Sequence, residues 1–164
     1  DFMISSGFGE LRPSSLGTGG YLPHMAVDII NVRNILTVTA DNSIVRFPGE
    51  PGSAVAAADG VVIESGYNSV YGWFAEISHG SKPEWTSRYR NLELLSTYYS
   101  HLAEDPGWKE GDRIQRNEKV GKIGDTGRAT GPHLHFEVRV YRPGGEFVNK
   151  TGHFDRMNPY IPAE

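Results

Sequence analysis

A strict alternation of polar and apolar residues runs from His133 to Val140 and constrains the fold of this chain more than any other feature. Successive side chains of a β-strand point to opposite faces, so this pattern predicts a strand with one apolar face. Gly131-Pro132 just before it is typical of a turn that starts a strand. The apolar residues expected to face a core are Leu134, Phe136, Val138 and Val140. His133 and His135 then lie side by side on the other face, where they can bind one metal ion, or one can bind metal while the other transfers protons.

A second candidate pair lies far upstream, in residues 24–30. The β-branched residues of this segment and the preceding Pro23 favour a strand, with His24 and Asp28 on one face. An i, i+4 pair also shares one face of a helix, so the two side chains stay neighbours in either conformation. With one of the later histidines they make a set of two imidazoles and one carboxylate, which is the arrangement of catalytic zinc with an open fourth position for water or substrate. Non-heme iron oxygenases use the same ligand types, so an iron site is the alternative.

Three further histidines have different surroundings. His79 ends a predicted strand at a turn and is interpreted as structural. His153 lies among glycine and aspartate, where a solvated side chain is expected. His101 lies in the short β-rich run 97–102, and a single histidine in such a run is more often packed or exposed than catalytic.

The composition fits a single β domain. The chain has 164 residues with 20 glycines and 10 prolines, which suits many short strands joined by turns. We therefore predict a mainly antiparallel β-sheet domain with little helix. The net charge of −4 gives no electrostatic footprint for nucleic acid, and without cysteines there is neither a disulfide nor a Cys-zinc site. No apolar run approaches the roughly 18 residues of a transmembrane helix.

Several motifs, including the two described above, follow one another in a definite order along the chain. Along the chain they are Ser5–Gly9 with Arg12, the pair His24 and Asp28, the hairpin-like segment 52–62, Tyr71-Gly72, Ile77–His79, Tyr99–Leu102, Gly111-Asp112, Gly121, Ile123-Gly124, Thr126-Gly127, Gly131–Glu137 and Asn158-Pro159. With this ordered set the chain resembles the lysostaphin-type zinc metallopeptidases, which are peptidoglycan endopeptidases of bacterial cell walls. The resemblance covers most of the chain and implies the lysostaphin-type peptidase fold, with long loops around an active-site groove.

The resemblance also implies roles for individual residues. It makes His24, Asp28 and His135 the ligands of one Zn²⁺ ion, and His101 and His133 the catalytic pair. Zinc lowers the pKa of bound water from 15.7 to about 7, and two neighbouring histidines can then deprotonate the water and protonate the leaving amine. Glu137 continues the same strand face, where it either orients a ligand as a hydrogen-bond acceptor or is a solvated strand carboxylate.

Three segments are longer than is usual in that family, at about 31–51, 81–97 and 141–156. The first is expected to form an added β-hairpin that turns at 40–42. Because loops on a rigid scaffold often carry specificity, the three are expected either to shape the substrate groove or to pack as ornament or against a partner. Candidate substrate-binding residues are Trp85, Arg88 and Tyr99.

The predicted function is hydrolysis of peptide bonds in peptidoglycan cross-links or stem peptides. Both Gly–Gly and D-alanyl cross-links fit this prediction. The alternative is a latent or non-catalytic envelope domain that activates another hydrolase or serves as its scaffold. Residues 1–164 are expected to form one peptidase domain of a longer exported protein, located in the cell envelope, whose upstream part carries the export signal and possible regulatory contacts.

Overall fold

The computed structural model describes residues 2–13, 21–31, 37–38, 44–45, 52–80, 94–141 and 154–157. Within these ranges every regular element is a β-strand, which confirms the predicted β class. The strands are β1 (Phe2–Ser6), β2 (Leu11–Pro13), β3 (Tyr21–Pro23), β4 (Val27–Asn31), β5 (Thr37–Val38), β6 (Ile44–Val45), β7 (Ser53–Val55), β8 (Gly60–Asn68), β9 (Gly72–Ser78), β10 (Leu94–Leu102), β11 (Arg113–Ile114), β12 (Lys119–Lys122), β13 (Leu134–Tyr141) and β14 (Phe154–Met157). No helix capable of crossing a membrane is found in the described ranges.

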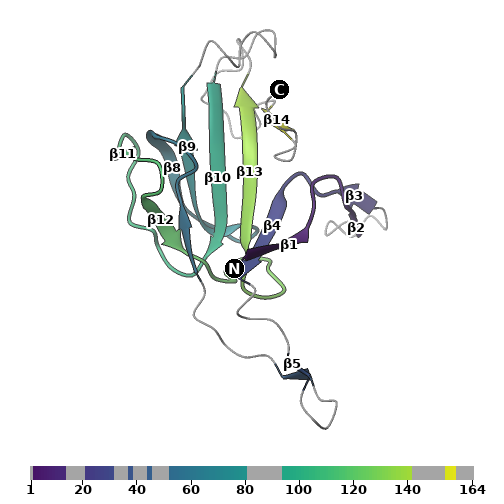
Figure 1. Ribbon diagram of the computed structural model, residues 1–164. Helices are drawn as coiled ribbons and strands as arrows, with labels where there is room; N and C mark the ends of the chain where they lie inside the picture. The colour runs from purple at the N-terminus through teal and green to yellow at the C-terminus, as the bar shows by residue number, and fades with distance from the viewer. Residues whose placement is uncertain are drawn as a thin grey trace.

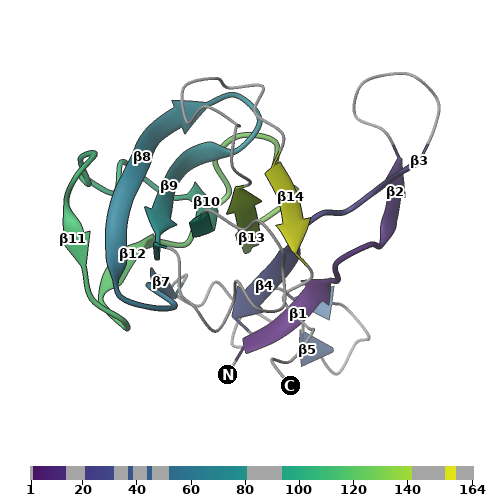
Figure 2. The same ribbon diagram turned by 90° about the horizontal axis from the view of Figure 1, so that it is seen from above.

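One antiparallel sheet forms the body of the molecule (Figure 1). Its strand order is β1-β4-β13-β10-β9-β8-β11, and β14 pairs with the part of β13 that β4 does not reach. The central strands β10 and β13 pair from Leu94 opposite Tyr141 to Ser100 opposite His135. Seen from above, β8 and β9 curve beside β10 and β13 (Figure 2). This register brings the histidine-bearing end of β13 next to both β10 and β4.

Three small strand pairs complete the described fold: β2 with β3, β7 with β12, and β5 with β6. The last pair joins Thr37 to Val45 and Val38 to Ile44, as expected for the hairpin predicted within 31–51. Leu94–Thr97, assigned above to the second long segment, belongs to β10, while residues 81–93 lie outside the described residues. Of the third segment, Tyr141 ends β13 and Phe154–Arg156 lies in β14.

The hydrophobic core lies against the face of the sheet that the alternation of β13 predicts. Leu134 is buried there, and Phe136 packs against the same cluster. The core consists mainly of Ala54, Ala56, Val62, Ala75, Ile77, Tyr99, Leu102, Ile114, Val120 and Ile123. The other face of β13 is buried as well, since Glu137 and Arg139 are 0% and 7% exposed. The polar side chains of β13 are therefore held in a protein interior and need partners there.

The strand predicted over 24–30 is wrong at its start, because β4 begins at Val27. His24 instead lies in the bend between β3 and β4. Its backbone N–H donates to the carbonyl of Glu10 (2.8 Å), and its own carbonyl accepts from the N–H of Gly9 (2.6 Å). Pro23 ends β3, so the chain turns at His24 before it enters the main sheet. His24 and Asp28 are therefore neighbours because the chain turns at His24, and not because both lie on one face of a strand.

Candidate metal centre

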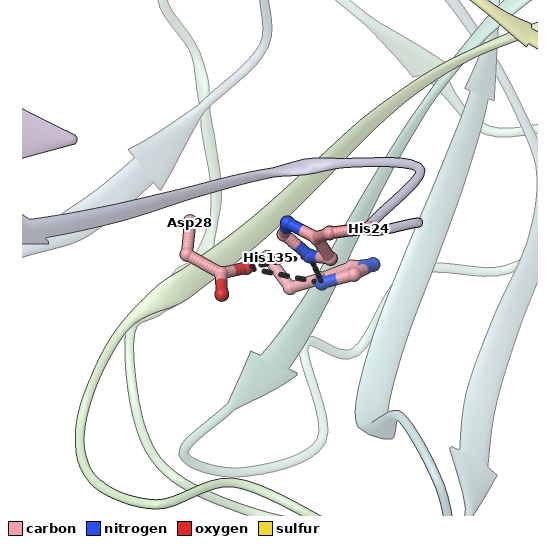
Figure 3. A group of neighbouring side chains, drawn as sticks. All are labelled: His24, Asp28 and His135. Carbon is pink, nitrogen blue, oxygen red and sulfur yellow. Dashed lines mark hydrogen bonds and ion pairs between the residues drawn. The ribbon is translucent and has the colours of Figure 1, made fainter. Parts of the chain in front are cut away.

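Three side chains predicted as metal ligands come together at one end of the main sheet (Figure 3). Asp28 lies on β4 directly opposite His135 of β13 in the strand register. The bend before β4 adds His24, whose ring lies 5.2 Å from that of His135. All three are buried, with exposed fractions of 8% for His24, 4% for Asp28 and 9% for His135. Among the residues that the structure describes, this is the group of histidines and carboxylates placed to hold a metal ion.

The three ligand atoms form a nearly equilateral triangle. The distances are 3.1 Å between His135 Nδ1 and Asp28 Oδ1, 3.4 Å between His24 Nε2 and Asp28 Oδ1, and 3.4 Å between His24 Nε2 and His135 Nδ1. Bonds of about 2.0–2.2 Å to a tetrahedral zinc ion separate two ligand atoms by about 3.3–3.6 Å. The triangle therefore has the size that a tetrahedral metal ion requires, with its fourth position left open.

Hydrogen bonds on the far side of each ring assign the tautomers. His24 Nδ1 lies 3.2 Å from the carbonyl oxygen of Gly7, and His135 Nε2 lies 2.8 Å from Glu137 Oε1. Because a carbonyl and a carboxylate only accept, those nitrogens carry the N–H of a neutral ring, which leaves the lone pairs of His24 Nε2 and His135 Nδ1 for a metal. Without a metal, His135 Nδ1 also faces Asp28 Oδ1 at 3.1 Å, so a ring protonated on both nitrogens donates to both carboxylates. Glu137 is thus an orienting acceptor, and the alternative of a solvated strand carboxylate is wrong.

The triangle also attracts a proton when no metal is bound. Burial by itself disfavours a charged His135, but its hydrogen bonds to Asp28 and Glu137 outweigh this and raise the pKa of His135 above its usual value. The site therefore favours positive charge at the position where the three ligand atoms converge. A divalent cation supplies more of that charge than a proton does.

Two further histidines border the triangle, as predicted. His133 Nε2 lies 3.8 Å from Asp28 Oδ1, and the ring centroids of His101 and His133 are 4.7 Å apart. Each ring donates Nδ1–H to a backbone carbonyl: His101 to Thr126 (2.7 Å) and His133 to Gly131 (2.8 Å). The Nε2 atoms of both histidines therefore carry lone pairs, as a base that accepts a proton requires.

A backbone irregularity brings His101 into the site. The pairing of β10 with β9 shifts register between Tyr99 and Leu102, and His101 lies in the left-handed region at φ 58°. This conformation is uncommon for a residue with a side chain and often marks a functional site. The N–H of His101 donates to the carbonyl of Tyr71, and its carbonyl accepts from the N–H of Gly124. The backbone of His101 is therefore hydrogen-bonded to Tyr71 on one side and to Gly124 on the other.

Thr126 fixes the carbonyl that orients His101, a role that the sequence motifs did not indicate. The hydroxyl of Thr126 donates to the carbonyl of Leu102 and accepts from the backbone N–H of Trp73 (3.0 Å). The loop packs so closely that a Cβ on Gly72, which has φ +65°, would lie 2.2 Å from Thr126 Oγ1. The sequence marks Thr126-Gly127 as one of the ordered motifs, but this long-range contact could not be predicted from it.

Other predicted site residues lie elsewhere. Tyr99 is 1% exposed in the core, and its hydroxyl is hydrogen-bonded to Ala57 and Thr97. This burial corrects the substrate-binding role predicted for Tyr99. Trp85 and Arg88 lie outside the described residues, as does His153. His79 uses both ring nitrogens, on Asp59 O (2.9 Å) and Thr97 Oγ1 (2.8 Å), which agrees with its structural interpretation.

A pH titration of the metal-free domain is expected to find His101 neutral far below the usual histidine range. Burial lowers the pKa of His101 from 6.5 to about 4, although its hydrogen bond to Thr126 acts in the opposite direction. Since the unfolded chain takes up this proton first, His101 contributes stability that is lost as the pH falls from about 6.5 to about 4. The chemical shift of the His101 ring proton in an NMR titration measures this directly. A midpoint at the ordinary value would contradict the burial described here.

An antiparallel β-sheet thus brings two imidazoles and a carboxylate together in a buried triangle that could hold a metal ion, with two more imidazoles beside it. Residues 42–150 of the chain match Peptidase family M23, and the chain belongs to that family. The fold and the family predicted from the ordered motifs are thereby confirmed.

Individual relatives agree with this assignment. The chain is 35% identical over 85 residues to the peptidoglycan DD-endopeptidase ShyC of Vibrio cholerae, a match that covers 52% of this chain and 17% of ShyC. Its fold is similar to that of a zinc-containing peptidase from Vibrio cholerae, with a TM-score of 0.55 and 29% identity over 84% of this chain and 33% of that one. The catalytic domain of lysostaphin from Staphylococcus simulans shares the fold, with a TM-score of 0.55 and 23% identity over 85% of this chain and 80% of that one. The chain spans less than a fifth of the length of the first curated relatives that it matches.

Proposed function

We propose that this domain is a zinc metalloendopeptidase that hydrolyses peptide bonds in the cross-links of peptidoglycan. The observation that carries the proposal is the convergence of five predicted residues: the triangle of His24, Asp28 and His135 with His101 and His133 beside it. The relative ShyC is a peptidoglycan DD-endopeptidase, which supports a D-alanyl cross-link as the bond that is cleaved.

The arrangement suits hydrolysis of an amide. Zinc held by the three ligands would lower the pKa of a bound water and polarise the scissile carbonyl. His101 and His133, whose Nε2 atoms are unprotonated in the neutral rings, would accept the proton of the attacking water and return it to the leaving amine. The carbonyls of Thr126 and Gly131 hold these two rings in the required orientation.

The presence of all five residues favours an enzyme over a latent or scaffolding domain. An iron oxygenase would need the three ligands but gives no role to His101 and His133. We also propose that residues 1–164 act as a single peptidase domain. Because peptidoglycan lies outside the cytoplasmic membrane, the proposed site of action is the cell envelope.

Digestion of purified sacculi by the zinc-loaded domain is expected to release uncross-linked muropeptides, and a chelator should abolish the release. Mass spectrometry of the products identifies the bond, and sacculi with D-alanyl and with glycine cross-links should be compared. Restoring zinc after chelation should restore cleavage. No release from a folded, zinc-loaded domain would overturn the proposed activity and favour the latent alternative.

A further inference from the structure

A buried polar network continues from the metal centre along β13 and across the sheet. Glu137 accepts from His135 through Oε1 and from Arg139 Nε through Oε2, each at 2.8 Å. Arg139 Nη1 then donates to Glu76 Oε2 on β9 at 2.7 Å. Hydrogen bonds therefore connect Glu76 to His135 without interruption.

Several contacts hold Glu76 and Arg139, the end of this network farthest from the triangle. The other oxygen of Glu76 accepts from the hydroxyls of Ser96 and Tyr141. The guanidinium carbon of Arg139 lies 3.6 Å from the centroid of the Tyr98 ring, so the cation stacks on an aromatic face. Glu76 and Arg139 are 3% and 7% exposed, so bulk solvent reaches little of either side chain.

The network fixes the position of the Glu137 carboxylate. Arg139 Nε holds Oε2, so the other oxygen, Oε1, is directed at His135 Nε2 at 2.8 Å. A hydrogen-bond partner at Nε2 sets the orientation of the imidazole ring, and with it the direction of Nδ1 toward the metal triangle. Without Arg139, Oε2 of Glu137 would lose this partner, and the ring of His135 would be oriented less precisely.

We propose that Arg139 and Glu76 are positioning residues that hold the Glu137 carboxylate in place and so orient His135 for metal binding. The inference rests on the proposed metal site and extends it across the sheet to β9. A purely structural role is the competing explanation. It is the weaker one, because buried ion pairs often contribute little net stability compared with apolar residues of similar size.

Zinc affinity separates the two explanations, because a structural role changes stability and leaves the affinity of the folded site unchanged. Changing the hydrogen-bond partner of a metal ligand typically costs 10–100-fold in affinity, and we expect about this loss in Arg139→Met. Glu76→Gln keeps the shape of the side chain and should show a smaller loss in the same direction. Arg139→Lys keeps the charge with a single nitrogen, so its affinity should lie between those of wild type and Arg139→Met. The measurement is competition with a chromophoric zinc chelator, with circular dichroism to establish folding.

Glu64→Gln is the matched control, because Glu64 lies opposite Glu76 in the register of β8 with β9 but is exposed. It should bind zinc as wild type does. Unchanged affinity in folded Arg139→Met, or in Glu76→Gln should the arginine variant not fold, would overturn the proposal. A wild-type domain that binds zinc but does not cleave sacculi would refute the proposed activity alone.

Discussion

Asp28→Ala is expected to weaken zinc binding by more than about 100-fold and to abolish cleavage, because loss of a direct ligand costs more than loss of a ligand's hydrogen-bond partner. Asp28 Oδ1 lies within 4 Å of a ring nitrogen of three histidines. The distances are 3.1 Å to His135 Nδ1, 3.4 Å to His24 Nε2 and 3.8 Å to His133 Nε2. Asp28 also supplies the only negative charge of the triangle. His135→Ala should have the same double effect, since it removes another corner.

Zinc content after dialysis and the dissociation constant by chelator competition measure the first effect, and release of muropeptides measures the second. Asp105→Ala is a suitable control, because that aspartate is exposed on a loop and accepts from the N–H of Gly107. It should keep both zinc and activity. An Asp28→Ala domain that retains wild-type zinc affinity would show that the metal binds elsewhere.

His101→Ala is expected to lower the rate of cleavage by about 10²–10⁴-fold while zinc binding is retained, because removing a general acid or base has effects of that size. His101 lies beside the triangle, with its ring centroid 5.6 Å from that of His135, and it is not one of the three converging ligands. Its loss should therefore separate proton transfer from metal binding. Zinc binding and cleavage should be lost together only when one of the three metal ligands is changed.

The left-handed backbone of His101 requires a second variant. Asparagine tolerates that conformation better than alanine, so His101→Asn removes the imidazole with less strain on the bulge. His79→Ala is the control for loss of a buried histidine: it should lower stability, since it removes the hydrogen bonds that the ring makes with Asp59 O and Thr97 Oγ1, yet retain zinc and turnover. Full turnover by either His101 variant would exclude His101 from catalysis.

Strand β13 shows what the alternation of residues in the sequence can predict and what it cannot. Alternation alone predicted that Leu134 and Phe136 face the core and that His135 and Glu137 share the opposite face, and the structure agrees. It could not reveal that the opposite face is buried too. That depends on which chain segments cover the sheet, which periodicity within one strand does not encode.

The two errors of sequence reasoning have a common cause. His24 was assigned to a strand, although a turn after Pro23 carries it, and Tyr99 was assigned to the substrate although its side chain fills the core. In both cases the residue type and its neighbours fit either environment. Packing against segments distant in the chain, Glu10 for His24 and Phe136 for Tyr99, decided between them.

The sequence by itself determined the β class of the fold, the family, and the identity of the five residues that converge in the site, because strand alternation and ordered motifs are local properties of the chain. Only the tertiary structure decided the ligand triangle, the tautomers of its histidines, the anchoring of His101 by Thr126 and the network from Glu137 to Glu76. These depend on register between strands far apart in sequence, where a shift of one residue would turn each side chain to the opposite face.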